Sequence, residues 1–69
     1  MKPSARNILK GIVKQVTPGA VDTEVMIELS SGVEIVSIIT KKSAESLGLK
    51  VGNSAYAFVK ASNVIIGVD

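Results

Sequence analysis

The 69-residue sequence contains no cysteine and no histidine. This absence removes disulfides, the usual zinc ligand sets, thiol nucleophiles and imidazole acid/base chemistry together. A chain this short buries a smaller share of its surface than a larger protein does, and small folds usually gain stability from disulfides, a structural metal or association. Because the first two sources are disfavoured here, the sequence predicts association with further copies of itself.

Aromatic residues and unbalanced charge are also scarce. Tyr56 and Phe58 are the aromatic residues, whereas proteins that bind single-stranded nucleic acid usually present several aromatic rings with basic residues between them. Eight basic and six acidic residues give a net charge of +2, without a block of like charge. This modest excess favours a small anion over a polyanion, so nucleic acid is not the expected partner.

Long apolar runs are absent as well. No run approaches the roughly 18 residues that a membrane-spanning helix needs, and residues 1–4 lack the apolar stretch of a secretory signal. We therefore expect a cytoplasmic protein without a membrane partner. Hydrophobic residues nevertheless make up 46% of the chain, a high share where there is little interior to hide them. The surplus predicts subunit interfaces.

Period-two alternation marks the clearest secondary-structure element. Over residues 21–29 a mostly apolar set (Val21, Thr23, Val25, Ile27 and Leu29) alternates with a mostly charged one (Asp22, Glu24, Met26 and Glu28), which predicts a strand with one buried face. A strand is expected before it at residues 8–16, with Gly11 as a bend or bulge, and another after it at residues 33–39. The intervening carboxylates, Asp22, Glu24 and Glu28, are expected to form a solvated strand face.

The pattern changes at Thr40. Thr40 can cap a helix over residues 41–47, and Gly48 suits the left-handed position that often ends a helix. Strands are expected again at residues 54–60 and 63–68. Three strands, a short helix and two strands are the element order of an oligonucleotide/oligosaccharide-binding (OB) barrel, although an open sheet with a docked helix fits the same order. We predict one all-β domain over residues 1–69 with one short helix, folded as an OB-like five-stranded barrel.

The chain offers little for enzyme chemistry. A serine nucleophile needs a base, and the candidate carboxylates and lysines are scattered. The spacing of the glycines fits neither a phosphate-binding loop nor a dinucleotide fingerprint. No catalytic residues are predicted, and the protein is not expected to be an enzyme.

Hydrogen-bond donors, by contrast, gather in three clusters: Ser4, Arg6 and Asn7; Thr40 and Ser43; Lys60 and Ser62. A tetrahedral oxyanion has four acceptor oxygens, so its site needs cations, hydroxyls and backbone N–H groups. A helix N-terminus adds partial positive charge and outward N–H groups. Each cluster also has a structural interpretation, since Thr40 and Ser43 can cap a helix and the two cations can be ordinary surface side chains.

Three segments of the sequence carry a resemblance to a known family. Residues 4–7, which read SARN, and residues 9–11, LKG, resemble the opening signature of the molbindin family and of the molybdate-binding modules of molybdate-responsive regulators and transporter ATPases. Residues 39–43 and 47–49 resemble its helix region, and residues 57–62 with Val64 resemble its closing strands. The matches extend from Ser4 to Val68, so the resemblance covers essentially the whole chain.

The resemblance implies an OB-like barrel, hexamers built as a trimer of dimers, and oxyanion sites between subunits. The implied ligand is molybdate or tungstate, held by hydrogen bonds with no cofactor and no direct metal ligand from the protein. One departure is Ser46, where some regulators place an additional Arg. By position, the implied contacts come from Ser4, Ala5 through its backbone, Arg6, Thr40, Ser43, Lys60, Ala61 through its backbone, and the adjacent Ser62.

The regulators and transporters of this family carry a DNA-binding or an ATPase domain beside the module. Because this sequence has neither, we expect it to store or buffer the oxyanion. Two other classes stay open. One is a nucleic-acid-binding OB module, which the low aromatic content disfavours. The other is a purely structural oligomerisation domain, in which a ligand has no effect.

Overall fold

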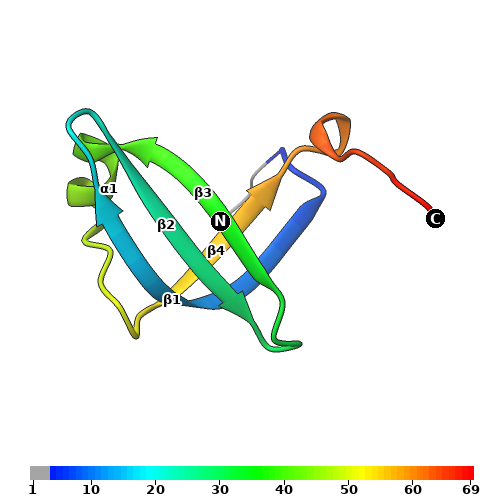
Figure 1. Cartoon of the computed structure of the whole chain (residues 1–69), viewed down its shortest axis with the longest axis horizontal. Coiled ribbons are helices and arrows are strands. Elements are labelled where there is room, and N and C mark those ends of the chain that lie inside the picture. Colours follow the sequence, from blue (N-terminus) through cyan, green and yellow to red (C-terminus); the bar gives the residue numbers. More distant parts are fainter. Residues whose placement is uncertain (1–3) are drawn as a thin grey trace.

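A computed structural model describes residues 4–69, which form one antiparallel sheet and a short helix. The elements are β1 (Asn7–Pro18), β2 (Asp22–Leu29), β3 (Glu34–Thr40), α1 (Lys41–Leu47), β4 (Ser54–Val59) and the 3-10 helix η1 (Ala61–Asn63). The strand order is β3-β2-β1-β4. The sheet curls, with α1 and η1 on opposite sides of the molecule (Figure 1).

Strand β1 is the longest and joins the two halves of the sheet, because it pairs with both β2 and β4. Its register against β2 shifts between Val13 and Gln15. The predicted bulge is therefore real, but it does not lie at Gly11, which pairs regularly with both neighbours. A Cβ atom on Gly11 would lie 2.7 Å from the carbonyl oxygen of Glu28, so glycine is needed here for the close approach of two strands.

The alternation in the second strand is confirmed. Thr23, Val25 and Ile27 are 1%, 2% and 5% exposed, and Asp22 and Glu24 on the other face are exposed. Val13 of β1 is completely buried against them, and half-buried side chains from β3, β4 and the segment after α1 complete this core. The inner face of the curled sheet thus supplies most of the buried apolar surface.

The helix begins and ends at the predicted residues. Thr40 has extended backbone angles, and its side-chain oxygen accepts a hydrogen bond from the Ser43 N–H. Gly48 adopts the left-handed conformation with φ of 62° and closes the helix with backbone bonds to Ala44 and Glu45. Ala44 is buried, which docks α1 onto the sheet. In the part of the chain that the structure describes, no helix is long and apolar enough to cross a membrane.

The predicted strand at residues 63–68 is wrong for the single chain. Residues 61–63 form η1, and residues 64–69 have no regular structure; they lead away from the sheet to the C-terminus (Figure 1). A strand needs a neighbouring edge for its hydrogen bonds, and η1 turns this segment away from its own sheet. The structure is therefore a curled four-stranded sheet, and the predicted five-stranded barrel is not closed within one chain.

Candidate functional site

Two of the three donor clusters lie at the same end of the sheet. Arg6 immediately precedes β1, and Lys60 immediately follows β4. These strands pair antiparallel, with Asn7 opposite Val59, and the Asn7 side-chain amide donates to the Val59 carbonyl oxygen at 3.1 Å. Because paired strands run about 4.8 Å apart, the structure brings the segments 4–6 and 60–62 together. The side chains of Arg6 and Lys60 are both exposed there.

The third cluster lies at the opposite end of β1. Thr40 pairs with Asp22 at the start of β2, and the neighbouring Thr23 pairs with Pro18 at the end of β1. Arg6 precedes the other end of β1, which has 12 residues. Because a strand rises about 3.3 Å per residue, the length of β1 that separates the two clusters is much greater than the diameter of a small ligand. Figure 1 shows α1 and η1 correspondingly far apart in the fold. One chain alone therefore does not assemble all the predicted contacts around one anion.

The hydroxyls of the third cluster are bonded to each other. The Thr40 hydroxyl donates to the Ser43 hydroxyl oxygen at 2.7 Å and accepts from the Ser43 backbone N–H at 3.0 Å. Thr40 is thus a helix cap, as its structural interpretation predicted. Since a hydroxyl has one proton and the Ser43 oxygen accepts here, the Ser43 proton remains for an outside acceptor.

The expectation of outward N–H groups at the helix start is only partly met. The Lys41 N–H donates to the Val21 carbonyl oxygen at 2.9 Å, and the Ser43 N–H is occupied by Thr40. Positive charge comes instead from the exposed side chains of Lys41 and Lys42 in the first turn. Neither lysine was among the residues that the sequence predicted to contact a ligand. The sequence did contain a sign of such a role. The first turn has no acidic residue, and two cations there are unfavourable next to the positive end of the helix dipole unless an anion compensates them.

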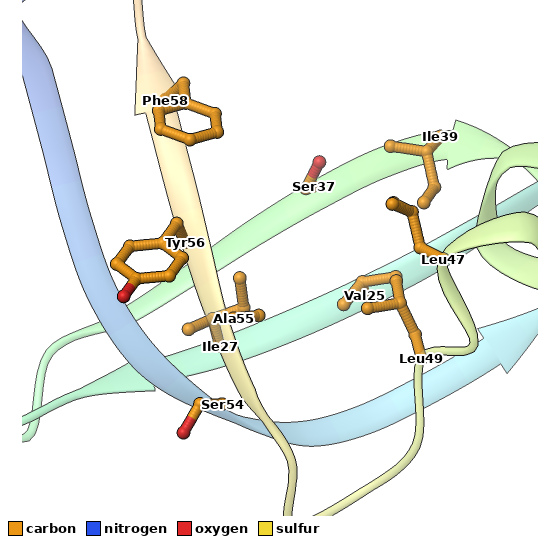
Figure 2. A pocket seen from close by; sticks show the side chains of 10 residues that line it. All are labelled: Val25, Ile27, Ser37, Ile39, Leu47, Leu49, Ser54, Ala55, Tyr56 and Phe58. Carbon is orange, nitrogen blue, oxygen red and sulfur yellow. The ribbon is translucent and has the colours of Figure 1, made fainter. Parts of the chain in front are cut away.

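An apolar groove beside β2, β3 and β4 does not contain the predicted contacts. It has a volume of about 390 Å³ and is lined by core and edge side chains of β2, β3 and β4 together with Leu47 and Leu49 (Figure 2). None of the eight predicted contact residues is among those that line it. The donor clusters are open surfaces in the single chain, where water screens their charge.

Comparison with known proteins identifies the family. Residues 3–66 match the TOBE domain. The molybdenum transport protein ModE of Azotobacter vinelandii is 48% identical over 69 residues, which cover 100% of this chain and 26% of that protein. Molybdenum-pterin-binding protein 2 of Clostridium pasteurianum is 46% identical over 66 residues, which cover 96% of this chain and 97% of that protein.

A solved structure of the cytoplasmic molybdate-binding protein ModG with molybdate bound superposes with a TM-score of 0.96 at 54% identity, covering 100% of this chain and 49% of that chain. The chain therefore belongs to the TOBE domain family and is a module of its molbindin type. It spans about a quarter of the length of ModE and about half of ModG. The family is one of ligand-binding domains, so this module is not an enzyme.

Proposed function

We propose that this chain binds molybdate, with tungstate as an equivalent ligand, and stores or buffers the oxyanion in the cytoplasm. The observation that carries the proposal is the 54% identity over the whole chain to a cytoplasmic protein with molybdate bound. The fold agrees along the entire length, so the donor-bearing segments at both ends of β1 belong to the shared architecture. We treat residues 1–69 as one binding domain.

The proposed contacts are those of the three clusters. Molybdate is a tetrahedral dianion whose four oxygens only accept hydrogen bonds, so charge-assisted donors hold it well. Arg6 and Lys60 supply charge. The hydroxyls of Ser4, Ser43 and Ser62 and the backbone N–H groups of Ala5 and Ala61 supply direction. Thr40 contributes by orienting the Ser43 hydroxyl through their 2.7 Å hydrogen bond.

The separation of the clusters within one chain supports a site shared between subunits. Donors to one small anion lie about 2.7–3.2 Å from its oxygens, which is incompatible with groups at opposite ends of β1. We propose that the Arg6 and Lys60 end of one subunit meets the Ser43 turn of another. The assembly proposed is the hexamer, a trimer of dimers. In it each subunit takes part in two sites: it contributes its Arg6 and Lys60 end to one site and its Ser43 turn to another, each shared with a neighbouring subunit.

Calorimetric titration of the protein with molybdate, tungstate and sulfate tests the proposal. We expect saturable binding of the first two and an increase in melting temperature at saturation, because a ligand that binds only the folded state stabilises it. Light scattering after gel filtration should give the hexamer mass. Molybdate that binds no better than sulfate would contradict the assignment.

The same measurements separate the other two classes. A nucleic-acid-binding module would bind RNA or DNA with a steep salt dependence, because released counterions dominate such binding. A structural oligomerisation domain would form the hexamer, but molybdate would leave its melting temperature unchanged.

A further inference from the structure

Asn7 is a polar residue on the apolar face of β1. Side chains of a strand alternate between its two faces, so Asn7 shares a face with Leu9, Gly11 and the completely buried Val13. The Asn7 side chain is itself half-buried. A polar group in such a place costs free energy unless it is hydrogen-bonded. Its hydrogen bond therefore shows what this side chain does.

The side-chain amide of Asn7 is bonded across the sheet. Its Nδ2 atom donates to the Val59 carbonyl oxygen at 3.1 Å and so links residues 52 positions apart. Asn7 and Val59 are the outermost pair of the register between β1 and β4, and β4 leads from there towards η1 (Figure 1). The ends of paired strands open more readily than their centres. The side-chain bond thus reinforces the ladder at the position where the ladder is weakest.

This bond acts on the main chain beside both cations of the proposed site. The Val59 carbonyl and the Lys60 N–H belong to one planar peptide group, so a bond that fixes the oxygen also fixes the direction in which Lys60 leaves the strand. On the other strand, the bond starts from the residue that directly follows Arg6. Because the side chains of Arg6 and Lys60 are exposed, their positions depend on the main chain that carries them.

We propose that Asn7 is a positioning residue of the oxyanion site. Its side-chain amide holds the Arg6 end of β1 and the Lys60 end of β4 at the separation that molybdate requires, and it does not contact the anion. Donors to a small anion must lie about 2.7–3.2 Å from its oxygens, so loosening one strand end lengthens several hydrogen bonds together. The inference rests on the proposed function and adds a residue that acts through Arg6 and Lys60.

Calorimetric titration with molybdate tests the contribution of this bond. Asn7→Ala removes the amide and leaves every proposed contact residue in place. We expect molybdate to bind about tenfold more weakly, as for the loss of one hydrogen bond between uncharged groups, with the assembly mass in light scattering unchanged. Asn7→Leu keeps the bulk of the side chain without the donor and should lose as much. The matched control is Asn53→Ala, an exposed position immediately before the other end of β4, which should bind like the wild type.

Amide hydrogen exchange without ligand tests whether the effect is local. The Asn63 N–H donates to the Lys60 carbonyl oxygen at 2.8 Å, whereas the Val13 N–H donates to the Asn53 carbonyl oxygen at 2.9 Å, towards the other end of β4. In both Asn7 variants the Asn63 N–H should exchange about tenfold faster, with the Val13 N–H unchanged, because only the nearby strand end opens more often. A purely structural role would accelerate both amides equally.

Three results would overturn the positioning role. The first is wild-type affinity for molybdate in either Asn7 variant, which in Asn7→Leu would mean that bulk alone suffices. The second is weaker binding with unchanged exchange at Asn63, which would make the side-chain amide a direct contact of the anion. The third is equal acceleration at Asn63 and Val13. Since the exchange measurement needs no ligand, a local change at Asn63 in a protein that does not bind molybdate refutes the proposed function alone.

Discussion

Two variants that each bind molybdate poorly are expected to restore binding when they assemble together. The variants are Arg6→Ala and Ser43→Ala, which lie at opposite ends of β1. If each site takes Arg6 from one subunit and Ser43 from another, a mixed assembly contains some sites with both residues intact. In a site built within one chain, every site of the mixture lacks one of them.

The size of the effect follows from the donors and the geometry. A hydrogen bond to a charged group contributes about 1.5–3 kcal/mol, so either variant alone should bind about 30-fold more weakly. Random assembly of equal amounts leaves both donors intact at about a quarter of the sites, for a site shared by two subunits of a symmetric oligomer. Calorimetry of the jointly refolded mixture should therefore show about a quarter of the wild-type number of tight sites.

The matched control mixes Arg6→Ala with Lys60→Ala. These residues flank the paired positions Asn7 and Val59, so in the proposed site one chain supplies both to the same anion and no mixture regains a complete set. The reasoning is refuted if the first mixture yields no tight sites, or if the control yields as many as the first mixture.

Three further predictions concern the core and ligand selectivity. Gly11→Ala should destabilise the fold by about 1–3 kcal/mol, because its Cβ would press on Ile27 and the Glu28 backbone. Thermal melts at fixed protein concentration measure this loss against Ser31→Ala, a change at an exposed turn position after β2. An equal melting temperature for the two variants would contradict it. Val13→Ala should lower the free energy of unfolding by about 2 kcal/mol in urea denaturation, since Val13 is 0% exposed. A loss below about 0.5 kcal/mol, which is typical of surface positions, would contradict its place in the core. Sulfate should bind the site at least about a hundredfold more weakly than molybdate, because its shorter sulfur–oxygen bonds stretch the hydrogen bonds from donors that are fixed in place. If sulfate displaced molybdate at equal concentrations in a competition titration, the site would be a loose cationic surface.

The sequence was sufficient for features that arise within a few residues. The Thr40 cap and the left-handed Gly48 are local, because the bonds that define them join residues no more than four apart. The buried face of residues 23–27 is set by side-chain alternation, which any strand imposes. The family signature is also carried by short segments, and so the molbindin resemblance was available from the residues alone and is confirmed.

The bulge and the role of Gly11 depended on tertiary structure. Sequence reasoning placed the bend at Gly11 because glycine often marks one, yet the register shift follows Val13. Which residue is left unpaired depends on how β1 is aligned with β2, and that alignment is a property of two strands together. Gly11 is needed for a contact with Glu28, 17 positions along the chain, which no local pattern reports.

The sequence by itself determined where the first three strands and the helix lie, and which side chains could donate hydrogen bonds to an anion. Only the tertiary structure decided that Arg6 and Lys60 lie at the same end of the paired strands β1 and β4 while Ser43 lies at the far end, and that the apolar residues 64–68 form no strand in their own chain. The physical reason is that periodicity and capping are short-range, whereas strand pairing and the grouping of donors depend on partners distant in sequence.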